Sequence, residues 1–371
     1  MQLICERDAL NRALSFVISR ARSKIKIPIL LNVKIEARHN EIVLTATDLD
    51  TRSEAACGAE VSAKGGTTVP AERLARLVDG LPAGSQLTLS MLPNELKIDC
   101  GRSHYRLPTM PIEDFPVEFE PSNPTEFELG CVDVKTLLDV SAAITVDGSR
   151  KMLEGGLLYQ KQAGEIAMIA TNGKQLVRRA IANGIAFDGR YIIPKAAMTE
   201  IVKLASEGEL LFRCGANAIE VSQGRRLFCS KLIEAEYPDI DRLIPKLTEH
   251  FILVDRAEFM AAFKRLSGLA TEYSTIDLRW KRHVPTLEMS LSGDGTGAEQ
   301  IACECELPDG AVSFGPSILG PMLEVLKGEM LQLHIEGPEK VVRLADPGNE
   351  SLIVLAFPRL PRNAATKEEA A

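Results

Sequence analysis

The sequence predicts an α+β protein made of three repeated units, each with two helices and antiparallel sheets. A strand–proline–helix pattern occurs three times, with its prolines at positions 70, 194 and 316 and separations of 124 and 122 residues. An aromatic–proline pair then ends each unit, at Phe115-Pro116, Tyr237-Pro238 and Phe357-Pro358. Between these marks, apolar and polar residues alternate with the period of half-buried strands. Together these features indicate an internal repeat of about 120 residues.

The first half of each unit is expected to hold an amphipathic helix followed by strands. "MQLIC" predicts an opening strand, and the helices are expected near 8–19, 133–144 and 255–268. Two units then carry a threonine before an acid or amide, at Thr47-Asp48 and Thr171-Asn172, 124 residues apart. The third unit has only Ser292-Gly293 nearby, so its match is weaker.

The second half of each unit is expected to begin with the proline-led helix, because proline is tolerated in a first helical turn, where its missing N–H would be unpaired anyway. Alternating strands follow, as in "QLTLSMLPNELKIDC" and "ELLFRCGANAIEVSQGRRLFCSKL". The glycine-rich "GDGTG" at 293–297 joins two strand patterns, which favours a hairpin turn over a nucleotide-binding loop.

The domain boundaries are placed where the composition turns polar and proline-rich. These stretches are "EFEPSNPTEF" at 118–127 and "PKLTEHF" at 245–251. We therefore expect domains at 1–122, 126–246 and 250–360. The last residues, 361–371, are small and charged, a composition typical of a disordered tail.

Composition narrows the class of protein. Apolar residues make up 45% and charged residues 25% of the 371, which is usual for a globular protein. We see neither a signal peptide nor an apolar run of the ~20 residues that cross a bilayer, so we expect a cytoplasmic protein without membrane contact. The eight cysteines are scattered without a CxxC pair and are expected to be reduced core residues.

The motifs of common catalysts are missing from the sequence. It has no GxxxxGK[ST] phosphate loop, no GxSxG elbow and no HExxH, and its histidines share no metal-ligand spacing. We expect no enzyme, cofactor or metal. One alternative stays open at "TATDLD", where Asp48 and Asp50 could hold Mg²⁺, although a strand-end turn in which the Asp bonds its own backbone is favoured.

Positive charge gathers in one segment of an acidic chain. The net charge is −8, which argues against a generally basic nucleic-acid binder. Segment 6–26, in contrast, holds six basic residues and two acids. Further basic residues lie on or beside expected helices, among them Arg73, Arg76, Arg150, Lys151 and Lys195. With few aromatics to stack on bases, this pattern favours weak, sequence-independent contact with DNA phosphates.

Several stretches resemble the bacterial replicative sliding clamp, the beta subunit of DNA polymerase III. They are "KIPILLNVKIEA", "TATDLD", "TTVPAERL", "GRSHYRLPTMPIEDFP", "IATNGKQL", "IIPKAAMTEIVKL" and "SKLIEAEYPDIDRLIPK", in the family's order and spacing. The resemblance covers residues 1 to about 360 and is thinner in the third unit. It implies three DNA-clamp domains per chain and a head-to-tail homodimer that closes into a six-domain ring around duplex DNA. Such a clamp is a processivity factor that tethers the replicative polymerase catalytic subunit and has no catalytic residues of its own.

The resemblance also implies roles for particular residues. Arg22 and Lys24 match the loop nearest DNA, and Arg150 and Lys151 match a second DNA-contacting loop, beside the helix residues Arg73, Arg76 and Lys195. In the dimer interface, Arg102 and Arg106 would pair with Glu304 and Glu306, and the apolar contacts would come from Tyr105, Leu107, Leu266 and Leu269.

A partner groove is expected between the second and third domains, for a short peptide from the polymerase, the clamp loader or other clamp-binding proteins. The positions that match it are Leu153, Thr171, Gly173, Lys174, Gln175, Leu176, Pro238, Arg242, Leu243, Val341, Leu355, Ala356, Phe357, Pro358 and Arg359. The chain departs from the family here. Asn172-Gly173-Lys174-Gln175 replaces the common Asp-Gly-His-Arg, and Phe357-Pro358-Arg359-Leu360 replaces Met-Pro-Met-Arg.

Two other interpretations stay open at this point. The departures in the groove also fit a second-copy clamp that serves a specialised partner. An enzyme with an unrecognised carboxylate site near Asp48 is the other alternative.

Overall fold

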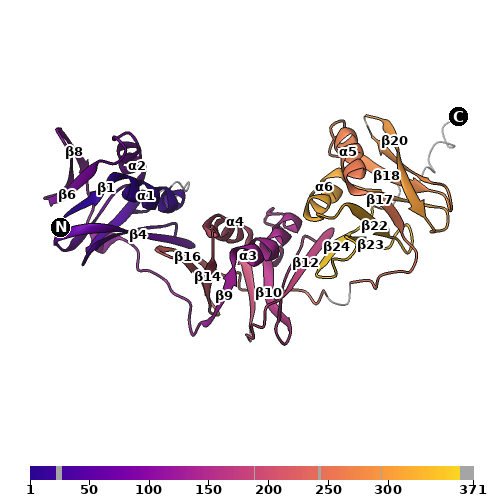
Figure 1. Cartoon of the computed structure of the whole chain (residues 1–371), viewed down its shortest axis with the longest axis horizontal. Coiled ribbons are helices and arrows are strands. Elements are labelled where there is room, and N and C mark those ends of the chain that lie inside the picture. The colour runs from indigo at the N-terminus through magenta and orange to yellow at the C-terminus, as the bar shows by residue number, and fades with distance from the viewer. Residues whose placement is uncertain (22–26, 188, 241–243, 294, 360–371) are drawn as a thin grey trace. The chain divides into compact units, whose positions relative to one another are not determined.

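The computed structural model describes residues 1–21, 27–187, 189–240, 244–293 and 295–359. The chain divides into two compact units, one of residues 1–134 with 196–232 and one of residues 135–195 with 233–371. Each unit therefore combines one outer repeat with part of the central one. The predicted α+β class with six repeated helices is seen among the described residues (Figure 1).

The first unit is built on a 12-stranded antiparallel sheet. Its main path runs β8-β7-β6-β1-β4-β16-β15-β14-β9, and β2, β3 and β5 join it through β4. Helices α1 and α2 pack side by side on one face (Figure 1). The elements are β1 Gln2–Glu6, α1 Arg7–Ala21, β2 Asn32–Arg38, β3 Glu41–Thr47, β4 Thr51–Ala63, β5 Gly65–Pro70, α2 Ala71–Asp79, β6 Gln86–Leu92, β7 Glu95–Cys100, β8 Ser103–Pro108, β9 Thr125–Gly130, α4 Lys195–Leu204, β14 Glu209–Cys214, β15 Ala218–Gln223 and β16 Arg226–Lys231.

The second unit has a 12-stranded sheet of its own, in the order β13-β10-β11-β12-β24-β23-β22-β17-β20-β19-β18-β21. Helices α5 and α6 contact each other, and α6 lies against β12 and β24. The elements are α3 Cys131–Leu138, β10 Gly155–Gln162, β11 Glu165–Thr171, β12 Gln175–Ala182, β13 Arg190–Pro194, β17 Ile252–Asp255, α5 Arg256–Ser267, β18 Thr275–Trp280, β19 Thr286–Ser292, β20 Gly297–Cys305, β21 Gly310–Phe314, α6 Pro316–Val325, β22 Met330–His334, β23 Val342–Ala345 and β24 Leu352–Ala356.

The proline-led helices begin where the sequence predicts. Pro70 is the N-cap of α2, Pro194 directly precedes α4, and Pro316 is the first residue of α6. The helix predicted at 133–144 is wrong in length, because α3 ends at Leu138 and a 3₁₀ turn, Asp139–Ala143, follows. The Asp139 carboxylate there accepts hydrogen bonds from Nε and Nη2 of Arg179, the shortest at 2.8 Å, so a tertiary contact holds this segment.

Sheet continuity across the repeats is the feature that positions the candidate site. The last strand of one repeat pairs antiparallel with a strand of the preceding repeat at two places, β16 with β4 and β24 with β12. We call the β4–β16 pair, with the turn before β4, the first joint, and the β12–β24 pair, with the turn before β12, the second joint. Each joint lies within a single unit.

Candidate functional site

The turn at the second joint is fixed by its own threonine and asparagine. Thr171 Oγ1 donates to the carbonyl of Gln175 at 2.6 Å and accepts from the Gly173 N–H at 3.0 Å. Asn172 Oδ1 accepts from the backbone N–H groups of Lys174 and Gln175, at 3.0 and 3.1 Å. Gly173 has φ +83°, a left-handed conformation that suits glycine. The sequence therefore specifies a tight turn that leaves Lys174 exposed.

The end of the third repeat lies against this turn. Leu176 of β12 pairs with Leu355 of β24, and the Phe357 N–H donates to the Lys174 carbonyl at 3.0 Å. Both leucines are buried, whereas the Phe357 ring is half-buried. The pairing brings residues about 180 positions apart in the sequence into one apolar surface.

That surface belongs to a larger apolar cluster on one face of the second sheet. Its core residues are Leu157, Tyr159, Ala167, Ile169, Leu176, Ala180, Ile192, Ile240, Ile353 and Leu355, with Ile233, Tyr237, Ile244, Val341 and Phe357 packed against them. The sequence indicates only part of this cluster. Alternation within β10 and β11 is the signal that could have added Leu157, Tyr159 and Ile169.

The segment before residue 241 covers part of the cluster and leaves a cavity beside it. Ile233 N–H donates to the Ile192 carbonyl at 3.0 Å, and the Tyr237 hydroxyl lies 3.4 Å from the Ile169 carbonyl. Burial raises the pKa of Tyr237, so this hydroxyl stays protonated and able to donate. A cavity of about 490 Å³ opens between this segment and the sheet, with Pro238 on its wall. Pro238, which the sequence assigns to the groove, thus borders this cavity.

Two predicted residues lie in places that the sequence did not indicate. Arg150 is assigned by the sequence to a DNA-contacting loop. Its side chain lies over the turn at the second joint, since a Cβ on Gly173 would be 3.0 Å from its Nη1. Arg359 bonds to the third repeat, through its N–H to the Ser313 carbonyl at 2.8 Å and its guanidinium to the Ser274 carbonyl at 3.3 Å.

The other predicted groove residues vary in exposure. Leu153, Thr171, Gln175 and Ala356 are buried, and Val341 and Pro358 are half-buried. Arg242 and Leu243 lie outside the described residues, as do the DNA-binding candidates Arg22 and Lys24.

The remaining DNA-binding candidates differ in how free their side chains are. Arg73 and Arg76 are exposed on α2, and Arg76 lies 3.3 Å from Glu72. Lys151 is exposed as well. Lys195 is half-buried and its Nζ donates to the Ile144 carbonyl at 2.7 Å, so part of its bonding capacity is used within the chain.

The predicted interface residues flank two strand edges. Strand β8, which carries Tyr105 and Leu107, ends the main path of the first sheet. In the second sheet, β20 pairs with β19 over residues 297–302 and with β17 on its other side only at 303–305. Among the described strands, residues 297–302 therefore have a partner on one side only. Leu269 is 56% exposed beside this edge, whereas Leu266 is 3% exposed and offers a partner almost no surface.

The charges near these edges are opposite. Arg102 and Arg106 are exposed at β8, and Glu304 and Glu306 are exposed at and after β20. Within the chain Arg106 lies 3.4 Å from Glu95, and Glu306 lies 3.1 Å from a ring nitrogen of His250.

The alternative metal site at Asp48 is a hydrogen-bonded turn. Its Oδ1 accepts from the Asp50 N–H at 3.1 Å, from the Thr51 N–H at 2.6 Å and from the Thr51 hydroxyl at 2.9 Å. Across the described ranges, no three His, Cys, Asp or Glu side chains gather as metal ligands would. The eight cysteines are free and buried, as predicted.

Comparison with known proteins identifies the family. Models of the N-terminal, central and C-terminal domains of the DNA polymerase III beta subunit match residues 1–118, 133–239 and 241–359. The chain belongs to the DNA polymerase III beta subunit family. Curated beta sliding clamps from Proteus mirabilis and Chlamydia pneumoniae are each 28% identical to it, over 96% and 90% of the chain and 99% and 93% of their own lengths.

Solved structures agree with this assignment. The DNA polymerase III subunit beta of Pseudomonas aeruginosa superposes with a TM-score of 0.91 at 25% identity, covering 97% of this chain and all of that one. A sliding clamp of Bartonella birtlesii, solved with griselimycin bound, gives a TM-score of 0.92 at 25% identity, with 97% and 99% covered. The predicted family and the predicted three-domain clamp fold are confirmed.

Family membership also decides between enzyme and clamp. The family's sliding clamps are processivity subunits of DNA replication, so the chain is a clamp subunit and the carboxylate-enzyme alternative is set aside. None of the helices in the described ranges is both long and apolar enough to cross a membrane.

Proposed function

We propose that two copies of this chain join head to tail into a closed ring that encircles duplex DNA and tethers the replicative polymerase. The observation that carries the proposal is the match of all three clamp domains, in order, to residues 1–118, 133–239 and 241–359. A ring holds DNA by enclosure, so it needs no tight contact, which fits a net charge of −8 with a basic segment at 6–26.

The two strand edges support ring closure. A heterologous contact that closes generates a ring, and an edge strand is a ready template for pairing with another chain. Strand β8 of one protomer and residues 297–302 of β20 in its partner are the edges we pair. Arg102 and Arg106 at the one edge complement Glu304 and Glu306 at the other, which favours this orientation over like-with-like pairing.

The second joint is the proposed docking site for partner peptides. An extended peptide would place apolar side chains against the half-buried Val341 and Phe357, which pack on the buried cluster that contains Leu176 and Leu355. Arg150 and Lys174 would contact its polar or acidic groups. The polymerase catalytic subunit, the clamp loader and other clamp-binding proteins would compete for it.

Processive synthesis tests the proposal. Primed circular DNA is extended by the cognate polymerase and clamp loader with and without this chain, and product length is measured. We expect much longer products when it is present. If product length is unchanged although the chain is folded and dimeric, the proposed processivity role is refuted.

A clamp that serves a specialised partner is the second candidate. The observation that favours it is the altered groove, where this chain has Lys174, Gln175 and Phe357 and the family commonly has other residues. A pull-down with the family's clamp-binding peptide separates the two, using Phe357→Ala as the control. Capture by the parent chain, lost in the variant, supports the replicative role, whereas no capture with the parent favours the specialised one.

A further inference from the structure

The two joints of the chain are built on the same backbone design. At the first joint, Thr47 Oγ1 donates to the Thr51 carbonyl at 2.8 Å, as Thr171 does to Gln175 at the second. Asp48 accepts the backbone N–H groups of residues 50 and 51 as Asn172 accepts those of residues 174 and 175. The joints are therefore two copies of one structure.

The strand registers extend this correspondence. Arg52 pairs with Cys229 across β4–β16, where Leu176 pairs with Leu355 across β12–β24. The N–H of Lys231 donates to the Asp50 carbonyl at 2.9 Å, as the N–H of Phe357 does to Lys174 at 3.0 Å. The registers also match five residues of the first joint, Lys34, Glu36, Thr45, Arg52 and Glu220, in that order with Leu157, Tyr159, Ile169, Leu176 and Arg343. Glu118 corresponds to Ile240, because each lies three residues after the aromatic residue of an aromatic–proline pair.

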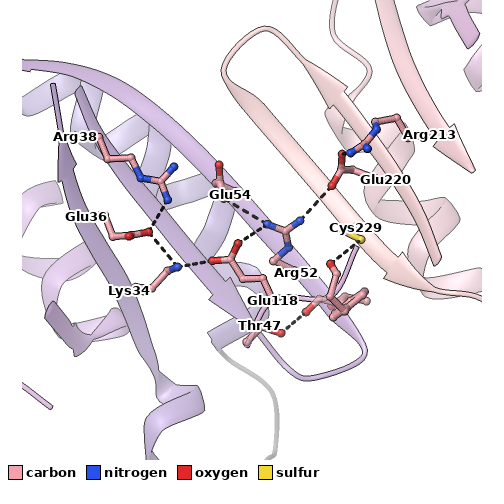
Figure 2. A network of polar contacts seen from close by, with 12 residues as sticks. Lys34, Glu36, Arg38, Thr47, Arg52, Glu54, Glu118, Arg213, Glu220 and Cys229 are labelled. Carbon is pink, nitrogen blue, oxygen red and sulfur yellow. Dashed lines mark hydrogen bonds and ion pairs between the residues drawn. The ribbon is translucent and has the colours of Figure 1, made fainter. Parts of the chain in front are cut away.

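The chemistry at these shared positions is opposite. At the second joint all of them except Arg343 belong to the apolar cluster, while at the first joint all except Thr45 belong to a network of ion pairs (Figure 2). Arg52 is its centre, with its guanidinium 3.0 Å from Glu118, 3.1 Å from Glu220 and 3.4 Å from Glu54. The Arg52 side chain is only 5% exposed and that of Glu220 only 7%, so this ion pair is buried where the second joint has apolar residues.

The network continues beyond Arg52 on both sides. Lys34 bonds to Glu118 and, at 3.0 Å, to Glu36, while Arg213 bonds to Glu220 at 2.7 Å (Figure 2). Burial alone would lower the pKa of Lys34, but its hydrogen bonds to Glu118 and Glu36 outweigh burial and raise it. Lys34 therefore keeps its charge, and the network ties strands β2, β4, β14 and β15 together with the segment after Pro116.

We propose that this network is an ionic lock that holds the first joint closed and confines peptide docking to the second joint. An apolar anchor entering the first joint would have to displace buried, paired charges and leave them without partners, which is strongly unfavourable. The proposal rests on the proposed groove, and it assigns Arg52 and Glu118 as residues that determine where partners bind.

The lock is tested first by hydrogen exchange, without any ligand. Arg52→Leu and Glu118→Ile each give a residue its second-joint identity and change the buried charge by one. The double variant leaves that charge unchanged, and in it Glu220 keeps its ion pair with Arg213 and Lys34 keeps its ion pair with Glu36. We expect each single variant to raise exchange in β16 about tenfold or more, and the double variant to stay below either single.

A matched control removes an exposed pair from the other unit. Arg279 and Glu288 face each other across β18–β19 at 3.4 Å, with side chains 57% and 44% exposed. Arg279→Leu and Glu288→Ile should alter exchange in their strands little, singly or together. Additive effects of Arg52→Leu and Glu118→Ile, as large in the double variant as in the two singles combined, would overturn the lock.

Peptide stoichiometry tests the confinement of docking. A labelled peptide with the family's clamp-binding motif is titrated against the parent, the double variant and a quadruple variant that adds Lys34→Leu and Glu36→Tyr. We expect one site per chain in the parent and a second, weaker one in the variants. Two sites in the parent, or one in every folded variant, would overturn the proposal. If the parent binds no peptide, the proposed groove fails, and hydrogen exchange alone then decides whether the lock exists.

Discussion

At the turn of the second joint, the effect of a substitution on peptide binding can be measured separately from its effect on stability. Gly173 has φ +83°, and a Cβ added there would lie 3.0 Å from Nη1 of Arg150. A side chain in the left-handed region costs about 1–2 kcal/mol, and the contact would also displace the guanidinium. We expect Gly173→Ala to lower stability by about 1–2 kcal/mol and to weaken binding of the clamp-binding peptide about tenfold, which corresponds to about 1.4 kcal/mol.

Gly184→Ala is the matched control. Gly184 has φ +74°, lies in the same unit, and has no heavy atom within 4 Å of the position that a Cβ would occupy. It should carry the same backbone cost without touching Arg150. Stability is measured by urea unfolding and peptide affinity by fluorescence anisotropy. If the two variants lose affinity equally, or if Gly173→Ala keeps the parent's affinity, Arg150 and this turn do not shape the groove.

Three further predictions concern the interface, the thiols and pH. Arg106→Glu should weaken the dimer about tenfold, because it places like charges at the edge we pair with Glu304; sedimentation velocity at micromolar concentration measures this, and an unchanged dimer would refute the pairing. The folded chain should react slowly with a thiol reagent at about pH 8, since burial raises the pKa of Cys214 to about 12 and all eight cysteines are buried; rapid labelling of the native chain would contradict it. The hydrogen bond from Arg7 and then that from a backbone N–H hold the pKa of Asp8 below its usual range, so the carboxylate adds stability at neutral pH that is lost as pH falls through the folded-state pKa. Asp8→Asn should therefore lower the urea midpoint more at pH 7 than at about pH 3, and an equal loss at both values would exclude this linkage.

The repeat made much of the fold predictable from sequence. Proline at a helix start and a threonine before an acid or amide act locally, so α2, α4, α6 and the two joint turns could be placed from short stretches. The amphipathic pattern at 133–144 was misleading because Asp139, within it, bonds to Arg179, about 40 residues away. A local pattern cannot anticipate that contact.

The candidate site was predicted only in part, because pairing between distant strands creates it. The resemblance indicated Leu176 and Leu355 as groove residues, yet only the β12–β24 register shows that they face each other. The position of Arg150 over Gly173 and the bonds of Arg359 to Ser274 and Ser313 depend on tertiary structure alone. The ionic lock was missed for the same reason, since its charges are spread from Lys34 to Glu220 and read as ordinary strand residues.

Retention on circular DNA tests the central claim most directly. The chain is loaded by its clamp loader onto nicked circular DNA, free protein is removed by gel filtration, and half of the sample is cut once with a restriction enzyme. A ring that holds DNA by enclosure stays on the circle and is lost from the linear molecule. Equal retention on both forms, or none on the circle, would contradict the account.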